Sequence, residues 1–450
     1  MIIEKHQNIN NKVQLVANME SYTKPKENWK IGVEYEKFAY SRSSKKPLAY
    51  EEIINIFSEL QKLGWTTIQE NGLITKLYNG ISNISLEPGG QLELSSTPHE
   101  NLHQVYNELF VYTEQLKNIG DVIGVSYLTL GFHPEWMLHE IPKMPNPNNR
   151  YDIISSYMKK ISKYGIDMMF RTCSAQVSID YSNEADMVKK YRVSLALQPI
   201  LTAIFSNSPF IDGKPTDRLS ARSFSWANAN PKRTGMFPVV FQEEFGFEKY
   251  VDHTLDLPLY FIYRDGKYID AKGQPFKDFL AGRLQILPGK LPTLQDWENH
   301  ISTLWPEVRL KKVLEMRGAD SGPISRICAL SALLVGILYD QSALDFSWDL
   351  VRGWDAETRN RLRHEVIHKG LDTMISKKVT VKDVAKEIVD IAKRGLTARA
   401  KIHDFDADES IFLDDIYEIV ISGKTPANVL LESYYGKWNE LIDVSDLKAF

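Results

Sequence analysis

The chain has 450 residues, of which 43% are hydrophobic and 25% are charged, and its formal net charge at pH 7 is -4. This composition is typical of a globular protein, and the length indicates one large domain with appendages or two to three domains. The balance of 54 basic and 58 acidic residues argues against a general nucleic-acid binder or a protein that binds anionic membranes.

The ends and the cysteines of the chain predict a cytoplasmic protein. The N-terminal sequence MIIEKHQNINNK lacks the apolar core of a signal peptide. No run of about 18 apolar residues is present, so we expect no membrane span. The two cysteines, Cys173 and Cys328, are too few for a disulfide framework and fit a reducing compartment.

The first informative stretch is IGVEYEKF, residues 31–38, which predicts a strand. Side chains on a strand alternate between its faces, so Glu34 and Glu36 share one face, with β-carbons roughly 7 Å apart. A divalent cation with oxygen ligands from both is the simplest way to relieve the repulsion between these carboxylates. The alternative is a solvated polar face of an antiparallel sheet.

The same arrangement recurs in ISNISLEPGGQLELSSTP, residues 81–98. Its central Pro-Gly-Gly predicts a turn between two strands. Glu87 and Glu93 fall on the polar faces of these strands, and leucine and isoleucine occupy the opposite faces. Three strands are therefore expected to present four carboxylates on one side of a sheet.

Two central segments carry further candidate residues. Residues 168–180, MMFRTCSAQVSID, predict a strand with Gln176 on its polar face and Cys173 on its apolar face. Arg171 has the apolar parity, so it can reach a site only from the strand end or through a bulge. Residues 218–235 predict a loop that holds Trp226 and four basic residues, Arg218, Arg222, Lys232 and Arg233, and would suit an anionic substrate. The alternative is a surface loop with scattered positive charge.

The last predicted strand covers residues 308–318, VRLKKVLEMRG, and places Glu315 and Arg317 on one face. An apolar helix over residues 324–339 is expected to bury Cys328. Beyond residue 341 only helices are predicted. We therefore divide the chain into an α+β catalytic body, residues 1–344, and a helical C-terminal portion, residues 345–450, that packs on it.

Two H-E-x-x-H patterns, at residues 99–103 and 364–368, raise the alternative of a zinc peptidase. Both are weak, because the first directly follows Pro98, the second precedes Lys369-Gly370, and neither has an evident third ligand. No glycine-rich phosphate loop is present, so a bound nucleotide would depend on metals and arginines. The predicted strands and the turn between them carry five acidic residues, Glu34, Glu36, Glu87, Glu93 and Glu315. Several metal ions bound to one ATP would account for so many.

Long motifs of this chain resemble the plant-type glutamate–cysteine ligases, in matching order from about residue 29 onward. They are IGVEYEKF, SLEPGGQLELSSTP, MMFRTCSAQVSID, LALQPI, ANANPKRTG and LEMRGADSGP. That family is similar to glutamine synthetase in its catalytic fold, a curved antiparallel sheet whose concave face binds ATP, metals and glutamate. The resemblance implies an α+β protein with flanking helices.

The activity implied by the resemblance is ATP-dependent joining of the γ-carboxyl of L-glutamate to the amine of L-cysteine through a γ-glutamyl phosphate, the first step of glutathione synthesis. A γ-glutamyl ligase for another amine is the alternative with the same fold, because no residue identifies a thiol pocket. The implied cofactors are ATP and Mg²⁺, and the protein is expected to be a monomer or homodimer.

The resemblance also implies roles for individual residues. The expected Mg²⁺ ligands are Glu34, Glu36, Glu87, Glu93 and Glu315. Arg171 and Arg222 are expected at substrate carboxylates, and Trp226 at the wall of the glutamate pocket or in a core or lid. Arg317 is expected at the phosphates, where it acts in catalysis with Glu315, and Gln176 at a metal or the nucleotide.

Plant members of the family carry regulatory disulfides and a transit extension. The disulfide positions correspond to Ala271 with Ile286, and to Cys328 with roughly Tyr106, so only Cys328 is a cysteine here. We therefore predict an enzyme without thiol switching. The chain also begins without the transit extension, which again predicts a cytoplasmic location.

Overall fold

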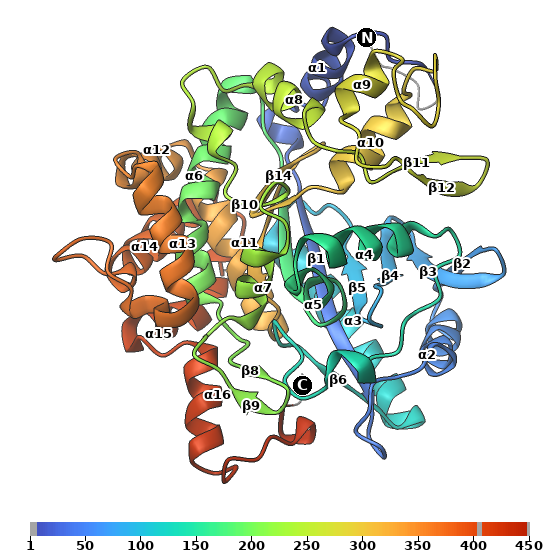
Figure 1. Cartoon of the computed structure of the whole chain (residues 1–450). Helices are drawn as coiled ribbons and strands as arrows, with labels where there is room; N and C mark the ends of the chain where they lie inside the picture. The colour runs from blue at the N-terminus through green and yellow to red at the C-terminus, as the bar shows by residue number, and fades with distance from the viewer. Residues whose placement is uncertain (1–6, 403–406, 448–450) are drawn as a thin grey trace.

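The computed structural model describes residues 7–402 and 407–447, and a large antiparallel sheet runs through its centre (Figure 1). Eight strands follow the order β14-β15-β7-β1-β5-β4-β3-β2, and a ninth, β6, pairs with β1. The strands are β1 (Ile31–Ser41), β2 (Thr66–Glu70), β3 (Leu73–Asn79), β4 (Ser82–Leu86), β5 (Leu92–Ser95), β6 (Val125–Leu128), β7 (Ser174–Ile179), β14 (Val308–Leu310) and β15 (Leu314–Asp320). The predicted α+β class is confirmed.

Strand β1 is the centre of this sheet, because it pairs with β5 on one side and with β7 on the other. The cross-strand register sets Glu34 opposite Gln176 and Glu36 opposite Glu93. The side chains between them, such as Val33 and Tyr35, are buried in the core. One face of the sheet is thus apolar and the other carries carboxylates, as the strand parity predicts.

Three helices cover the apolar face. Helix α11 (Ile324–Leu338) packs on β1 and β7, α3 (Leu102–Ile123) packs on β1, and α6 (Glu184–Ile204) packs on β15. A further helix, α14 (Val381–Arg399), lies against α11. The two helices meet at Gly336 and Gly395, where a β-carbon on either residue would collide with the backbone of the other helix. Glycine is required at this crossing because only it allows such close approach.

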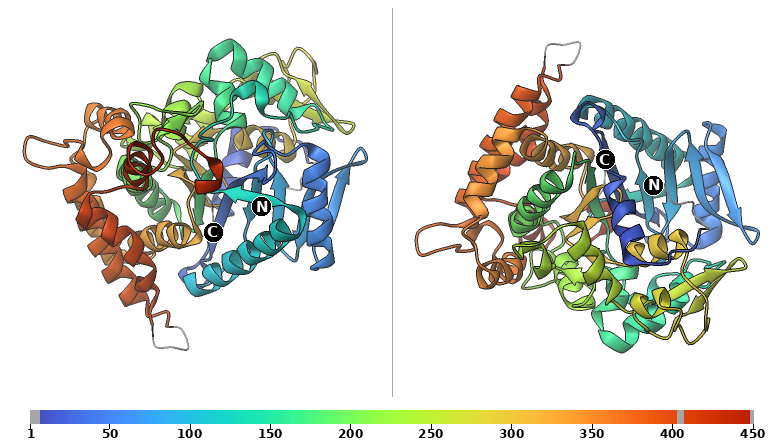
Figure 2. Two further views of the ribbon diagram at one scale, coloured as in Figure 1. Left: turned by 90° about the horizontal axis from the view of Figure 1, so that it is seen from below. Right: turned by 90° about the horizontal axis from the view of Figure 1, so that it is seen from above.

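The C-terminal helices lie on the side of the molecule away from β2 and β3 in both views of Figure 2, where they are orange to red. They are α12 (Gln341–Val351), α13 (Ala356–Lys369), α14, α15 (Asp414–Ser422) and α16 (Pro426–Tyr435). One hydrophobic cluster runs without a break from Ile9 through the sheet to Val420. The helices after residue 344 therefore share their core with the preceding part of the chain.

No single helix in the described ranges is long and apolar enough to cross a membrane. Helices α11 and α12 pass the same criteria only when taken together, and the chain bends by 92° between them.

The polar face of the sheet is roofed by α4 (Arg150–Ile161), α5 (Tyr164–Phe170), α7 (Ala221–Ala229) and the hairpin of β11 (Phe261–Arg264) and β12 (Lys267–Asp270). The remaining elements surround this core. They are α1 (Lys12–Glu20), α2 (Tyr50–Lys62), α8 (Phe247–Leu255), α9 (Phe276–Leu280), α10 (Leu294–Ser302), β8 (Phe210–Ile211), β9 (Lys214–Pro215), β10 (Thr234–Gly235) and β13 (Trp305–Pro306).

Three predicted segments differ from the structure. Residues 308–318 form a hairpin of β14 and β15 rather than one strand, and the turn lacks the Gly, Asn or Pro that usually marks one. Residues 168–170 belong to helix α5, so β7 is shorter than predicted. The predicted loop at 218–235 contains helix α7, whose N-cap Ser220 accepts a hydrogen bond from the backbone of Ser223.

Candidate active site

The polar face of the sheet is the floor of a cavity of about 490 Å³. Side chains from the helices α4, α5 and α7 and from the β11–β12 hairpin form the opposite wall. Seven residues predicted from the sequence line this cavity: Glu34, Glu36, Glu87, Glu93, Gln176, Trp226 and Arg317. The antiparallel register brings six of them together, because each belongs to a strand of the sheet or directly follows one. The seventh, Trp226, faces them from the roof helix α7.

Polar groups on neighbouring strands orient two of the carboxylates. Glu36 accepts hydrogen bonds from the Ser174 backbone N–H (2.5 Å), the Ser174 hydroxyl (3.0 Å) and Gln176 Nε2 (3.3 Å). Glu93 accepts one from the Ser85 hydroxyl at 3.3 Å. These bonds hold the carboxylate oxygens near the sheet and leave both side chains on the cavity wall.

Burial and mutual repulsion make these carboxylates hard to ionise together. Burial, with Glu315 adding to it, raises the pKa of Glu34 to about 6. Burial and the charge of Glu36 raise the pKa of Glu87 to about 7. Burial, Glu34 and Glu87 raise the pKa of Glu93 well above its ordinary value. A cation bound among them would remove this penalty, because it favours the ionised form of each.

Glu315 differs from the other four, because arginines hold it beneath the cavity floor. It is 3% exposed and is not among the cavity-lining residues. Its Oε2 accepts hydrogen bonds from Arg309 and Arg317 at 2.7 and 2.6 Å. Burial alone would raise the pKa of Glu315, but Arg309, Arg317 and Lys311 outweigh it and lower that pKa. Glu315 therefore holds Arg317 in place in this structure, and its role as a metal ligand stays a prediction.

Arg317 is fixed from several directions. Its Nη1 also donates to the Gln176 amide oxygen, and its carbonyl oxygen accepts from Arg222 Nη2 at 2.7 Å. The ladder between β7 and β15 shifts register between Met316 and Ala319, which frees that carbonyl for Arg222. The Trp226 ring lies 5.2 Å from the Arg222 guanidinium and 5.6 Å from that of Arg317.

Two arginines predicted at substrate carboxylates lie outside the cavity lining. Arg222 is buried behind Arg317, as described above. Arg171 follows the end of α5, and its guanidinium pairs with Asp212 at 2.5 Å and with Asp167 at 3.3 Å. The prediction that Arg171 contacts a substrate disagrees with this geometry, because two carboxylates already neutralise its charge.

Four basic residues that the sequence analysis did not single out line the cavity: Lys76, Arg150, Arg309 and Lys311. Arg150 begins α4 and lies over the rings of Phe261 and Tyr268, at 5.6 and 5.9 Å. Arg309 and Lys311 have the same parity as Glu315 and Arg317 along residues 308–318. That alternation was a signal in the sequence that could have identified them, whereas nothing near Arg150 indicated a site.

A buried ion pair connects the cavity to the C-terminal helices. Arg363 of α13 pairs with Glu307, and both are nearly fully buried. The carbonyl oxygen of Glu307 accepts the backbone N–H of Arg317 at 2.9 Å. Helix α13 thus supports the strand pair that carries Arg317.

The residues present fit a magnesium site in which phosphate oxygens of a bound nucleotide would supply some of the metal ligands. Within the described ranges, no three His, Cys, Asp or Glu side chains are grouped closely enough to hold a metal by themselves. The cavity instead offers a wall of carboxylates with raised pKa values. Mg²⁺ commonly takes one or two carboxylates and completes its shell with water and phosphate oxygens.

The two H-E-x-x-H patterns do not form zinc sites. His99 precedes α3, so it does not share a helical face with His103, and its ring contacts Glu108. In the second pattern His368 contacts the carbonyl oxygen of Asp217 at 2.9 Å. The zinc peptidase alternative therefore has no support in the geometry.

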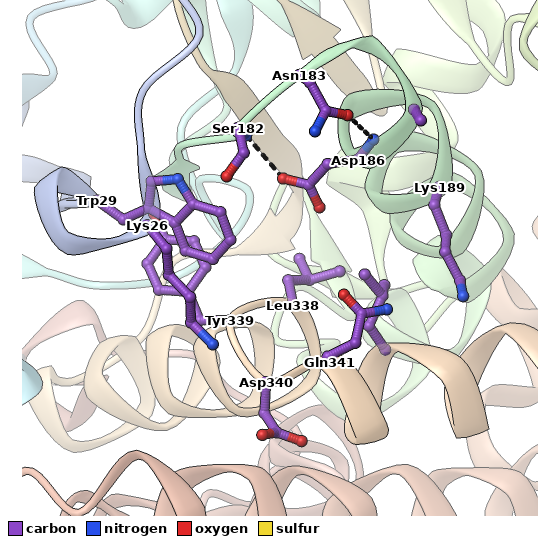
Figure 3. A pocket seen from close by; sticks show the side chains of 12 residues that line it. Lys26, Trp29, Ser182, Asn183, Asp186, Lys189, Leu338, Tyr339, Asp340 and Gln341 are labelled. Atoms are coloured by element: carbon purple, nitrogen blue, oxygen red, sulfur yellow. Dashed lines mark hydrogen bonds between the residues drawn. The ribbon is translucent and has the colours of Figure 1, made fainter.

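A second hollow, of about 380 Å³, lies beside the rings of Trp29 and Tyr339, whose planes are tilted by 34° (Figure 3). Three of its polar residues, Ser182, Asn183 and Asp186, lie at the start of helix α6. Asp186 accepts the Ser182 N–H at 2.8 Å, and its own N–H donates to Asn183 at 3.0 Å. None of the predicted site residues lines this hollow.

Comparison with known proteins gives consistent results along nearly the whole chain. The family described as Glutamate-cysteine ligase family 2 (GCS2) matches residues 30–445. The chain is 47% identical over 433 residues to the chloroplastic glutamate–cysteine ligase of Medicago truncatula, covering 96% of this chain and 84% of that protein. The corresponding protein of Arabidopsis thaliana is 46% identical over 430 residues, covering 95% and 81%.

A solved structure has the same fold. The crystal structure of glutamate–cysteine ligase from Francisella tularensis in complex with AMP aligns with a TM-score of 0.51 at 14% identity, covering 92% of this chain and 86% of that one. This similarity agrees with the predicted antiparallel-sheet ligase fold.

The relatives correct one prediction. The sequence analysis predicted a cytoplasmic protein, but the relatives from Medicago truncatula, Nicotiana tabacum and Arabidopsis thaliana are all named chloroplastic. These names point to the plastid and contradict the cytoplasmic prediction. The start of a chain and its cysteine content were too indirect to decide a location.

Proposed function

The chain belongs to glutamate–cysteine ligase family 2, and on this premise we propose that it joins the γ-carboxyl of L-glutamate to the amine of L-cysteine with ATP. It is an ATP-dependent ligase that carries out the first step of glutathione synthesis. The observation that carries this proposal is the family match over residues 30–445. A cavity lined both by carboxylates and by arginine and lysine side chains supports it.

The reaction must bring two anions together. An oxygen of the glutamate γ-carboxylate forms a bond to the γ-phosphorus of ATP, and the bond from that phosphorus to the β–γ bridging oxygen breaks, its electron pair leaving with ADP. The neutral cysteine amine then forms a bond to the acyl carbon of γ-glutamyl phosphate. The carbon–oxygen bond breaks, phosphate leaves with that electron pair, and the amine loses a proton.

We assign the cavity carboxylates Glu34, Glu36, Glu87 and Glu93 to binding Mg²⁺, which when bound to ATP neutralises phosphate charge. Arg317 faces the cavity and stabilises the charge of the transferring phosphoryl group. Glu315 and Gln176 orient the Arg317 guanidinium through its Nη1. Arg222 holds the backbone of Arg317 from behind, and the Trp226 ring on the roof helix lies 5.6 Å from the Arg317 guanidinium.

Arg150 takes the role that the sequence analysis gave to Arg171. It lines the cavity, and its guanidinium is held over the rings of Phe261 and Tyr268. An arginine fixed in this way suits a bidentate bond to the α-carboxylate of glutamate.

An amine screen tests the proposed function. Phosphate release from ATP is measured with glutamate alone and with cysteine or other amines, and the product is identified by mass. We expect cysteine to give the highest rate and γ-glutamylcysteine as product. A different amine that stimulates release where cysteine does not would refute the cysteine assignment and favour another γ-glutamyl ligase.

A further inference from the structure

The turn between β14 and β15 carries two consecutive lysines that face different surroundings. Lys311 lines the cavity, and its backbone N–H donates to the Val313 carbonyl at 3.0 Å to close the turn. Lys312 is exposed and pairs with Glu298 at 3.2 Å. One turn therefore places one lysine inside the site and its neighbour in solvent.

Charges at this end of the cavity do not balance. Arg309, Lys311 and Arg317 supply three positive charges, and their nearest carboxylates are Glu315 and Glu34. Both arginines are bound to Glu315, and Arg309 also donates to the carbonyl oxygens of Ser302 and Leu304, at 3.2 and 3.1 Å. Lys311 has no ion pair with a carboxylate anywhere in residues 7–402 and 407–447. Its ammonium is thus available to an incoming anion without leaving a carboxylate, and it adds to the charge of Arg317, which stays bound to Glu315.

The chemistry of the ammonium group indicates which anion it takes. During phosphoryl transfer, negative charge spreads over the three equatorial oxygens of the moving group. A lysine ammonium is a compact point charge on a flexible stem, so it can follow a group that moves between two oxygens. Arg317, whose planar guanidinium is fixed by Gln176 and Glu315, adds a charge of fixed position beside the same group.

We propose that Lys311 is a catalytic residue of this ligase, whose ammonium contacts the γ-phosphoryl oxygens of ATP. The proposal rests on the proposed function. Lys311 follows the γ-phosphoryl group as its bond to the bridging oxygen of ADP breaks and its bond to the glutamate γ-carboxylate oxygen forms. It neither gives nor takes a proton in this step and acts only through its charge.

The test compares Lys311→Met with Lys312→Met, two variants that remove the same charge one residue apart. We expect Lys311→Met to lower kcat by about 10²-fold or more, and Lys312→Met to stay within twofold of the wild type. Lys311→Arg is expected to recover part of the lost rate. Each variant is first checked by thermal unfolding, and Lys311→Met should unfold no earlier than the wild type, because it relieves repulsion with Arg309.

Binding of ATP and of ADP, measured by calorimetry without glutamate, separates this role from others. Loss of the γ-phosphate contact should weaken ATP binding at least fivefold in Lys311→Met and leave ADP binding unchanged. Unchanged kcat and ATP affinity, or a raised KM for glutamate alone, would overturn the proposal. If the wild type showed no cysteine-dependent turnover, the proposed function would fail, and the comparison of ATP with ADP would still decide the role of Lys311.

Discussion

Removal of one charge from the carboxylate floor should stabilise the metal-free protein while it abolishes activity. Glu34 is the residue of choice, because it lies on the central strand opposite Gln176 and lines the cavity. Glu34→Gln keeps the shape of the side chain and removes its charge. The variant therefore isolates the electrostatic contribution from the packing.

The size of the effect follows from the pKa of Glu34, which burial raises from 4.5 to about 6. At about 1.36 kcal/mol per pH unit, ionised Glu34 lowers the free energy of unfolding by about 2 kcal/mol. The unfolded chain loses its proton near pH 4.5 and the folded protein only near pH 6. The contribution of Glu34 to the free energy of unfolding is therefore greatest below pH 4.5, falls as pH rises from 4.5 to 6, and is constant at higher pH.

The assay is urea unfolding in EDTA at pH 4.5 and pH 8, with Glu20→Gln on the exposed end of α1 as the control for charge removal. We expect Glu34→Gln to raise the free energy of unfolding by about 2 kcal/mol at pH 8, and by less than about 0.5 kcal/mol at pH 4.5. Its kcat should fall by about 10²-fold or more. A variant that is less stable than the wild type at pH 8, or that retains normal turnover, would refute this reasoning.

Three further predictions concern other buried groups. Arg363→Met should lower the free energy of unfolding by about 3–5 kcal/mol, because it leaves Glu307 charged and unpaired. The double variant with Glu307→Leu should recover stability, and if it does not, the loss of the ion pair is not the cause. Activity should change less than twofold with reductant, in the wild type and in Cys328→Ser, because Cys173 and Cys328 are both buried and burial raises the pKa of Cys328 to about 12; a large change in both proteins would contradict this. Burial and Arg233 lower the pKa of His300 to about 3. Because the unfolded chain then binds a proton that the folded protein does not, the free energy of unfolding falls by about 4 kcal/mol as pH falls from 7 to 3.5. The free energy of unfolding of His300→Gln should therefore depend less steeply on pH in this range.

The carboxylate face could be predicted from the sequence because it depends on a local rule. Strand parity alone places Glu34 with Glu36 and sets both opposite the apolar residues of β1. The pairing of strands that are distant in the sequence, such as β7 with β1, then brings Gln176 beside them. Parity predicts which face a residue occupies, and only the tertiary fold decides which strands are neighbours.

Residues whose role depends on an irregular local structure were harder to predict. Arg171 belongs to a motif shared with the family, but it lies where α5 ends, so its direction does not follow strand parity. The turn of β14 and β15 has no glycine or proline to mark it, so only the parity that Lys311 shares with Glu315 and Arg317 indicates that it faces the site. Arg150 reaches the cavity from a roof helix, and no periodic pattern connects a roof helix to the strands below it.

The pairing of β1 on both sides has a consequence for how this protein can change over time. Loss of a single residue early in β1 would turn Glu34 and Glu36 toward the interior and Val33 and Tyr35 toward the cavity, because the side-chain period of a strand is two. Insertions are therefore tolerable in the surface loops but not in this strand. A change in the length of β1 therefore removes the whole carboxylate floor in one step, whereas substitutions remove its carboxylates one at a time.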